Sequence, residues 1–265
     1  MERIGELLKD SKILYLEEFY SRINKQFKGA VSNLEKKGSP AADMLKKCKY
    51  SVFYTSPLNT LKEGPIYFLG LNPAGEPEIG FKEETLKYFN EKEINWCDYC
   101  DEKWVYKNRK LRKGEAKLQK NVQNILGYIQ EKLVGDPNIR PIFSTNLFFF
   151  RSPHSDDLKK YEKENYDCWQ YHEEFLKIVQ PKIIVCNGNN EALSAYSVLK
   201  EHFLNDIENL QQKHLYGNYS LKSFILKTTF WGINNVLVIG IPHLSRYMPN
   251  KDIYQELSTI ISKML

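Results

Sequence analysis

IYFLGLNPAG, at residues 66–75, is the stretch from which the fold of this chain can be argued. Its first six residues form an apolar run without polar alternation, which is typical of a strand buried on both faces of a sheet. Three further runs share this character, at residues 141–150 (PIFSTNLFFF), 183–186 (IIVC) and 236–241 (VLVIGI). We therefore expect four buried strands.

Helical patterns separate these strands. Apolar residues recur at helical spacing over residues 118–133 and 169–179, and a third helix is expected over 191–204. Strands that alternate with helices predict a three-layer α/β/α fold with a central four-stranded parallel sheet. Residues 1–58 also look helical, so we expect an N-terminal helical extension packed on an α/β domain that covers residues 59–265.

Composition narrows the class of protein. The chain has 265 residues, 42% of them hydrophobic, which is enough for a full core. It has no apolar run long enough to span a membrane, and its first residues lead into a charged amphipathic pattern rather than a signal peptide. We therefore expect a cytoplasmic protein without a membrane partner. Because no motif requires a second chain, we expect a monomer without an obligate protein partner.

The five cysteines do not form a recognisable framework. They are scattered and odd in number, which disfavours a set of structural disulfides. Cys97 and Cys100 have the spacing that begins many metal or iron–sulfur sites, but such a site needs a second pair. Cys168 and Cys186 are the candidates, and Cys186 lies within an expected buried strand. We therefore expect neither a metal nor a cofactor.

Positive charge is concentrated in one segment. Residues 107–120 contain seven lysines and arginines against a single glutamate, whereas the whole chain has a net charge of only +5. Such a patch suits a phosphate backbone, although a solvated loop and helix face would have the same composition. On the first reading, Lys110, Arg112 and Lys113 would contact DNA.

Polar residues stand at or just after each expected strand end. They are Asn72-Pro73, Thr145-Asn146, Asn187-Gly188-Asn189 and Pro242-His243-Leu244-Ser245-Arg246. In parallel sheets, ligands bind beyond the carboxyl ends of the strands. We therefore expect the chemistry of this protein at that edge.

Two of these segments resemble known motifs. GLNPAG, at residues 70–75, is similar to the first motif of the uracil-DNA glycosylase superfamily, in the Gly-hydrophobic-Asn-Pro-Gly form of its mismatch-specific and single-strand-selective branches. PHLSR, at residues 242–246, resembles its second motif, usually His-Pro-Ser-Pro. The resemblance covers roughly residues 64–250, with departures at Leu244 and Arg246, where the family has proline, and at Ala74. It identifies the chain as a divergent member.

The resemblance implies a DNA glycosylase that flips an altered pyrimidine out of DNA and hydrolyses its N-glycosidic bond, in base-excision repair or in defence against modified foreign DNA. Asn72 would hold the attacking water, and His243 would donate a hydrogen bond to the departing base. No lysine stands at a motif position, so a monofunctional enzyme without Schiff-base chemistry is expected.

The resemblance also implies a base pocket and a DNA-contacting loop. Asn146 would read the pairing edge of the base beside Leu71, and an aromatic ring would stack on it, with Phe81 the first candidate and Phe89 or Phe149 the others. The small Ala74 would leave room for a substituent at position 5 of a pyrimidine. The segment of residues 245–247 would touch the duplex. Tyr247 would fill the gap left by the flipped base, Arg246 would insert there or pair with a phosphate, and Ser245 would bind a phosphate.

Other interpretations remain open at this point. A non-catalytic DNA- or nucleotide-binding member of the same fold is the main alternative, motivated by Leu244 and Arg246. An unrelated α/β hydrolase ranks behind it, because the sequence has no Gly-x-Ser-x-Gly, P-loop or Gly-x-Gly-x-x-Gly motif. Asn72, Asn146 and His243 also have purely structural interpretations, as a turn residue, a backbone-bonded amide and a strand-end histidine.

Overall fold

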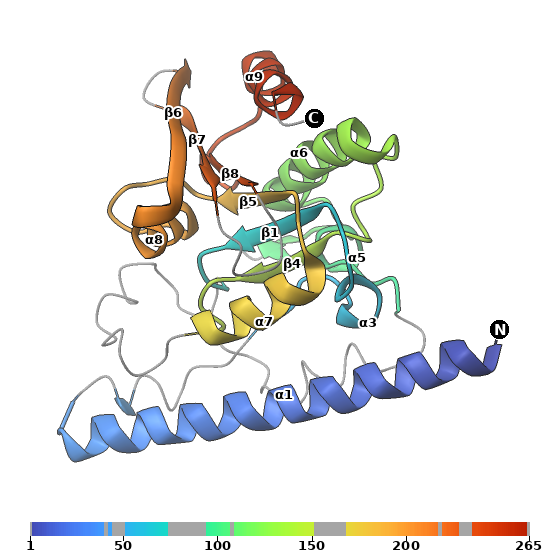
Figure 1. Cartoon of the computed structure of the whole chain (residues 1–265), viewed down its shortest axis with the longest axis vertical. Helices are drawn as coiled ribbons and strands as arrows, with labels where there is room; N and C mark the ends of the chain where they lie inside the picture. Colours follow the sequence, from blue (N-terminus) through green and yellow to red (C-terminus); the bar gives the residue numbers. More distant parts are fainter. Residues whose placement is uncertain are drawn as a thin grey trace.

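A mixed sheet forms the centre of the molecule. The structure is a computed structural model that describes residues 2–39, 42–43, 51–73, 94–106, 109–150, 168–216, 219–227 and 235–263. Within these residues the sheet has six strands in the order β4-β1-β5-β8-β7-β6 (Figure 1). The four expected strands are confirmed as parallel neighbours: β1 (Ile66–Gly70), β4 (Phe143–Asn146), β5 (Ile183–Asn187) and β8 (Val236–Ile241).

The other two strands were not predicted. β6 (Ile207–Tyr216) and β7 (Tyr219–Leu226) form an antiparallel pair, and β7 continues the sheet by pairing antiparallel with β8. Polar residues such as Lys222 and Ser223 interrupt the apolar run that would mark a buried strand. Both are nevertheless buried, because β7 lies inside the sheet between β6 and β8.

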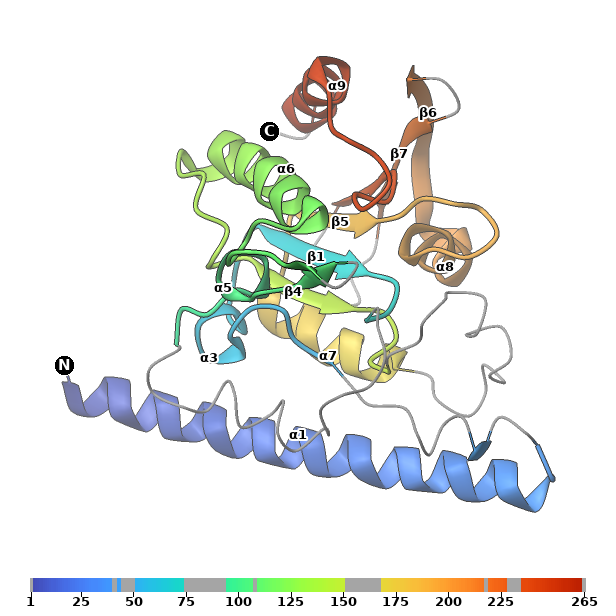
Figure 2. The ribbon, with the colours of Figure 1, turned by 180° about the vertical axis from the view of Figure 1, so that it is seen from behind.

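Helices cover both faces of the sheet (Figures 1 and 2). One face packs against α1 (Glu2–Lys36), α7 (Trp169–Val179) and α8 (Ala195–His202), and the other against α5 (Asp98–Asp101), α6 (Lys117–Val134) and α9 (Lys251–Ser262). The remaining described elements are short: α3 (Pro57–Thr60), β2 (Val105–Tyr106), β3 (Arg109–Lys110) and a 3₁₀ turn, η4 (Leu204–Asp206). None of the helices in the described residues has the length and apolar character that crossing a membrane requires.

The long helix α1 is anchored to the same apolar core as the sheet. The ring of Phe19 is fully buried and lies 5.1 Å from the ring of Phe175 and 5.2 Å from that of Tyr171, measured between centroids. Polar contacts complete the anchor, because Arg22 donates two hydrogen bonds to the carboxylate of Glu174, at 2.6 and 2.7 Å. Helix α1 is therefore held to α7 by packing and by an ion pair.

The segment before α3 is extended where a helical pattern was expected. Ser51 N–H donates to the Phe149 carbonyl at 2.7 Å, and Tyr54 N–H donates to the Ser144 carbonyl at 3.0 Å. Phe53 forms an antiparallel bridge with Thr145. Residues 51–55 therefore cover the outer edge of β4, which would otherwise present unpaired backbone groups.

A buried histidine braces the carboxyl end of β4. Nε2 of His172 lies 3.0 Å from the Leu147 carbonyl, which can only accept, so Nε2 carries a proton. Nδ1 then accepts from the Tyr67 hydroxyl at 2.8 Å. Burial of the ring lowers the pKa of His172 from 6.5 to about 4. The histidine is therefore neutral and links β1, α7 and the residue that follows Asn146.

His172 is expected to make the folded state sensitive to acid. Between pH 6.5 and about pH 4, the unfolded chain binds a proton at this histidine that the folded chain does not. The free energy of unfolding should therefore decrease as the pH falls through this window, by about 3 kcal/mol in total. Urea unfolding at a series of pH values measures this effect, with the non-titrating His172→Gln variant as reference. Parallel pH dependence in the two proteins would contradict the assignment.

Candidate active site

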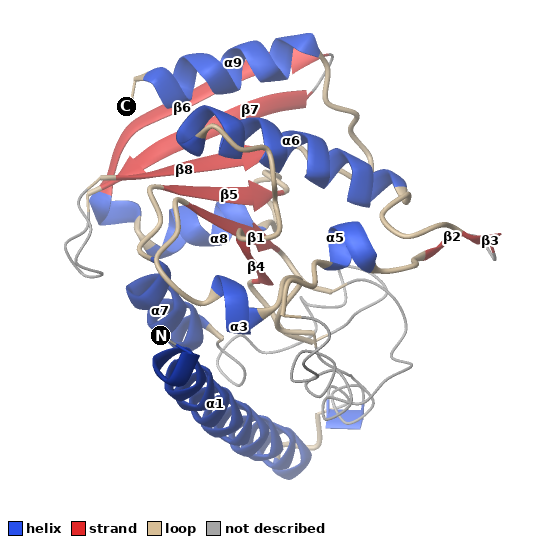
Figure 3. Ribbon diagram, turned by 90° about the vertical axis from the view of Figure 1, so that its right-hand side faces the viewer, coloured by secondary structure: helices blue, strands red, loops and turns tan. Residues whose placement is uncertain are grey.

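The carboxyl ends of the four parallel strands bring the expected site residues to one edge of the sheet. In the register of the strands, Gly70 of β1 pairs with Asn146 of β4, and Asn187 of β5 pairs with Ile241 of β8. Asn72 and His243 follow two residues after β1 and β8. The arrowheads of these strands point toward the side of the molecule that carries β2 and β3 (Figure 3). The strand order also reverses here: β4, which follows β1 in the chain, lies on one side of β1, and β5 lies on the other. Open α/β sheets bind ligands at such a switch point.

Asn146 is the most buried of the asparagines at this edge. Its side chain is 5% exposed, and its Nδ2 is buried without a hydrogen-bond partner. The Oδ1 atom lies only 2.1 Å from the place where a Cβ on Gly70 would stand. Glycine at position 70 therefore leaves the space that the Asn146 amide occupies. A buried amide donor without a partner costs about 1–3 kcal/mol of stability. A bound ligand with an acceptor atom would satisfy this donor.

Substitution of Gly70 by alanine is expected to destabilise the protein by about 1–3 kcal/mol, because the new methyl group meets the enclosed Asn146 amide. The same change in an Asn146→Ala background should cost at least about 1 kcal/mol less, since the opposing oxygen is gone. Denaturant unfolding measures both values. Gly29→Ala in helix α1 is a matched control with the opposite sign. A Cβ at this position would have no atom within 4 Å, so the free energy of unfolding should increase by about 1 kcal/mol. Additive effects at positions 70 and 146 would contradict the contact.

Asn72 directly follows the end of β1. It is half-buried, and its Nδ2 donates to the carbonyl of the next residue, Pro73, at 3.0 Å. This local bond orients the amide, so Oδ1 is the atom through which the side chain would accept a hydrogen bond from a ligand or a water. The neighbouring Leu71 is also half-buried, and it packs against the core while its carbonyl accepts from Phe148 N–H at 2.9 Å. Leu71 thus supports the site mainly through its backbone.

Two asparagines hold the loop of residues 243–247 in place. Asn187 accepts a hydrogen bond from Leu244 N–H at 3.0 Å. Asn121, on helix α6, donates to the carbonyls of Leu244 and Tyr247 at 2.8 and 3.0 Å. The side chain of Leu244, which stands where the resembling family has proline, is fully buried. Side-chain hydrogen bonds and an apolar anchor therefore fix this loop, and the role of Asn121 has no signal in the sequence.

His243 is held in one neutral form by its neighbour. Its Nδ1 accepts from Ser245 N–H at 3.3 Å and lies 2.8 Å from the Ser245 hydroxyl. A backbone N–H can only donate, so Nδ1 is unprotonated and the neutral ring carries its proton on Nε2. The side chain reaches solvent, yet partial desolvation lowers its pKa below 6.5, and the charge of Arg246 acts in the same direction. His243 therefore presents a neutral Nε2–H donor near pH 7.

Gly188, at the end of β5, lies beside this histidine. Its φ of +112° falls in the region that favours glycine, and a Cβ there would stand 3.7 Å from Cδ2 of His243. The imidazole of His243 thus lies against the end of β5, on the side of β8 that faces β1. The expected catalytic pair is therefore separated by a single strand end.

Tyr247 does not have the role that was expected for it. Its ring is 3% exposed and packs in the apolar core, and its hydroxyl donates to Asn250 Oδ1 at 3.2 Å. The expectation that it fills a gap in a DNA duplex is wrong, because the Asn121 and Asn187 contacts turn this side chain inward. The side chains of Ser245 and Arg246 are exposed. Met248, the residue that follows this loop, is apolar and 73% exposed.

The basic segment lies next to the same loop. Lys117, at the start of α6, donates to the carbonyl of Arg246 at 3.2 Å. Nζ of Lys113 lies 5.4 Å from the ring centroid of Trp96, and the exposed Arg112 forms a 3.4 Å ion pair with Glu115. Lys110 belongs to β3, which projects beyond α5 (Figure 3). The start of α6 thus joins the positive segment to the loop that carries His243.

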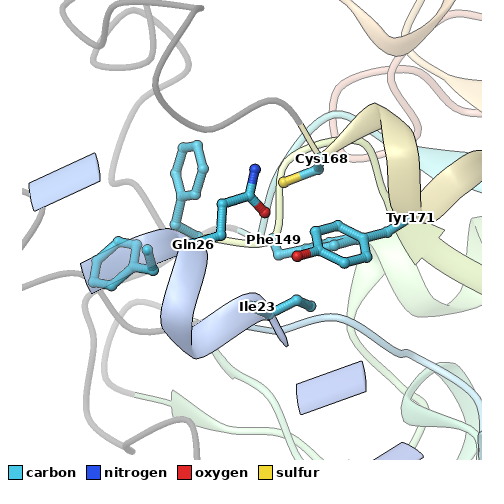
Figure 4. A pocket seen from close by; sticks show the side chains of 7 residues that line it. Ile23, Gln26, Phe149, Cys168 and Tyr171 are labelled. Atoms are coloured by element: carbon cyan, nitrogen blue, oxygen red, sulfur yellow. The ribbon is translucent and has the colours of Figure 1, made fainter. Parts of the chain in front are cut away.

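Of the three aromatic residues expected to stack on a base, the structure describes one, and that one is buried in the core. Phe81, its alternative Phe89 and the open position Ala74 lie outside the described residues. Phe149, the third candidate, is 1% exposed and packs against α1, so it belongs to the core. It also lines a small apolar pocket between α1, the residues that follow β4 and α7 (Figure 4), together with Ile23, Gln26, Phe27, Phe150, Cys168 and Tyr171.

Comparisons with known proteins identify no relative of this chain. A scan against protein-family models found no model that matches, and searches of curated proteins and of solved structures also found no match. The candidate active site is therefore defined by the chain's own residues: Asn72, Asn146, Asn187, Gly188, His243 and Ser245, beside the basic segment.

Proposed function

We propose that this protein is a DNA glycosylase that hydrolyses the N-glycosidic bond of an altered pyrimidine. The observation that carries the proposal is the Asn146 amide, which is 5% exposed and has a buried Nδ2 without a partner at the ligand-binding edge of the sheet. A planar amide offers one donor and one acceptor side by side, which matches the pairing edge of a pyrimidine. In a duplex this edge is occupied by base pairing, so the base must be extruded before a protein pocket can bind it.

The loop after β8 supports the chemical part of the proposal. When the glycosidic bond breaks, the sugar gains oxocarbenium character and the base leaves with negative charge on its ring and carbonyl oxygen. A neutral Nε2–H on His243 donates a hydrogen bond to that oxygen as the charge develops. Ser245 holds the tautomer that this role requires, through its contacts with Nδ1.

Asn72 supplies the second part. An amide is not a base, but its Oδ1 accepts a hydrogen bond from a water and thereby orients that water toward the sugar. This suffices where the glycosidic bond is largely broken before the water adds. The water then forms the new bond to the sugar carbon and releases a proton, while the base leaves and takes up a proton. We assign no lysine to the reaction, so the enzyme is monofunctional.

The positive segment supports DNA as the substrate. Helix α6, which contacts the His243 loop, begins at Lys117 and follows Arg112 and Lys113 in the chain. The exposed Arg246 belongs to that loop. Cationic side chains of this kind neutralise phosphates and position a duplex without reading its sequence. We assign the exposed Met248 as the apolar side chain that enters the gap left by a flipped base. The cellular role we propose is repair, or defence against foreign DNA with modified bases.

Oligonucleotides with uracil, mismatched thymine or 5-modified cytosines test the proposal, each as single strand and as duplex. We expect abasic sites from at least one of these bases, detected by alkaline strand cleavage. Asn72→Ala should lower the rate by about 10²-fold, a usual loss when a reacting group is no longer held in position. Asn138→Ala is the matched control, because this exposed asparagine precedes β4 at the opposite edge of the sheet.

The outcomes separate the proposed enzyme from its alternatives. Salt-sensitive DNA binding without abasic sites would indicate a non-catalytic binding protein of the same fold. If the protein neither binds any of these substrates nor releases a base from them, the DNA assignment is removed altogether. Base release that survives in Asn72→Ala and His243→Ala would show that the reaction uses another site.

A further inference from the structure

Cys97 and Cys100 form a pair of thiols that the proposed glycosylase reaction does not use. Cys97 immediately precedes α5 and Cys100 lies within it. Cys100 N–H donates to the Cys97 carbonyl at 2.8 Å, which closes a turn between the two residues. The Cα atoms at the ends of such a turn are less than about 7 Å apart, and a disulfide needs about 4.4–6.8 Å. The backbone therefore holds both cysteines within bonding range.

The two thiols differ in exposure and in character. Cys97 is buried, whereas Cys100 is half-buried. The neighbouring Cys97 thiol lowers the pKa of Cys100, and the positive charge of Arg140 acts in the same direction. The neighbouring Cys100 thiol and desolvation raise the pKa of Cys97. Cys100 is thus the accessible sulfur that ionises first, and Cys97 lies behind it as the second thiol.

The surrounding contacts keep this turn rigid. Asp101 accepts from Cys97 N–H at 3.0 Å and forms a two-point ion pair with Arg140. Gln119 and Gln123, on α6, donate to the carbonyls of Asp98 and Tyr99 at 2.7 and 2.5 Å. The pair is therefore preorganised, so joining the two sulfurs requires little movement of the backbone.

We propose that Cys97 and Cys100 form a redox-active dithiol that is oxidised reversibly to an intramolecular disulfide by a low-molecular-weight disulfide. The Cys100 thiolate attacks one sulfur of the oxidant, forms a mixed disulfide and releases one thiolate. Cys97 then loses its proton and attacks the Cys100 sulfur, which releases the second thiolate. One protein dithiol and one small disulfide become one protein disulfide and two small thiols.

Two other uses of these cysteines fit the structure less well. In the part of the chain that the structure describes, no group of three or more His, Cys, Asp or Glu side chains is placed to hold a metal ion. Cys168 and Cys186 are buried on the other face of the sheet from Cys97, so they are not placed to join it. Cys48 lies outside the described residues.

Thiol counting on the folded full-length protein tests the proposal. The protein is incubated with excess oxidised glutathione, unfolded, alkylated with iodoacetamide and analysed by mass spectrometry. We expect three of the five cysteines to be alkylated instead of all five, and a peptide that links Cys97 to Cys100. Treatment with dithiothreitol should restore all five.

Single substitutions then assign the two roles, with circular dichroism to confirm that each variant is folded. Cys97→Ser should accumulate glutathione on Cys100, because the second thiol is missing. Cys100→Ser should take up little glutathione, since Cys97 is buried. The matched control Cys168→Ser should still form the disulfide. All five thiols remaining alkylatable in the wild type, a disulfide to another cysteine, or protection that a zinc chelator removes would each overturn the proposal.

Discussion

Replacing His243 by alanine is expected to lower the rate of base release by about 10²- to 10³-fold, the usual loss when a donor to a developing negative charge is removed. The expected reason is the loss of the Nε2–H donor that Ser245 keeps in place. Single-turnover kinetics at saturating enzyme measure the chemical step directly. DNA affinity should change little, because the ground-state base oxygen carries less charge than the departing one.

Two controls separate this role from a structural one. His243→Gln keeps an N–H donor at similar reach, so it should recover part of the lost rate. Ser245→Ala removes one contact to Nδ1 but leaves the backbone N–H, so a smaller loss is expected. In the proposed mechanism the neutral ring is the active form, so the rate should hold as the pH falls to 6.5 and decline only below it, where His243 takes up a proton. An unchanged rate in His243→Ala, or a wild-type rate that rises on acidification, would contradict the assignment.

Replacing Phe19 by alanine is expected to destabilise the protein by about 3–5 kcal/mol, the usual cost of a large-to-small change in an aromatic core. Phe19 is fully buried where α1, α7 and residue 53 meet, and its ring contacts the rings of Phe53, Tyr171 and Phe175. Urea unfolding followed by circular dichroism measures the free energy of unfolding. Such a loss is a large fraction of the stability of a typical domain.

Leu14 provides the matched control for this substitution. It lies on the same helix but is 65% exposed, so Leu14→Ala should change the stability by less than about 0.5 kcal/mol. Equal effects of the two substitutions would show that α1 does not share the core. Separate unfolding transitions for helix α1 and for the sheet would lead to the same conclusion, because a common core predicts one cooperative transition.

The arrangement of the core could be predicted because it depends on local patterns. The runs at residues 66–71, 183–186 and 236–241 lack polar alternation, and only a strand covered on both faces tolerates that pattern. Their alternation with helical patterns then predicts parallel strands, and parallel strands bring their carboxyl ends to one edge. The places of Asn72, Asn146 and His243 along that edge follow from this topology.

The pair of antiparallel strands and the orientation of several side chains could not be predicted. β7 contains the buried Lys222, whose ammonium group donates to the Asn189 carbonyl at 3.0 Å and pairs with Glu191. A lysine in a sequence normally indicates a solvated position. Here these partners offset the desolvation of the buried ammonium group. His172 likewise has no local signal, because its two partners, Tyr67 and Leu147, are distant in sequence.

The sequence by itself determined the layers of this protein, the parallel strands and the edge that carries the polar motifs, because strand and helix periodicities are local properties of the chain. Only the tertiary structure decided which side chains of that edge are exposed and which are buried. Tyr247 turns into the core while Ser245 and Arg246 stay exposed, because Asn121 and Asn187 bind the loop backbone from other elements. Contacts between residues more than 50 positions apart leave no trace in local composition.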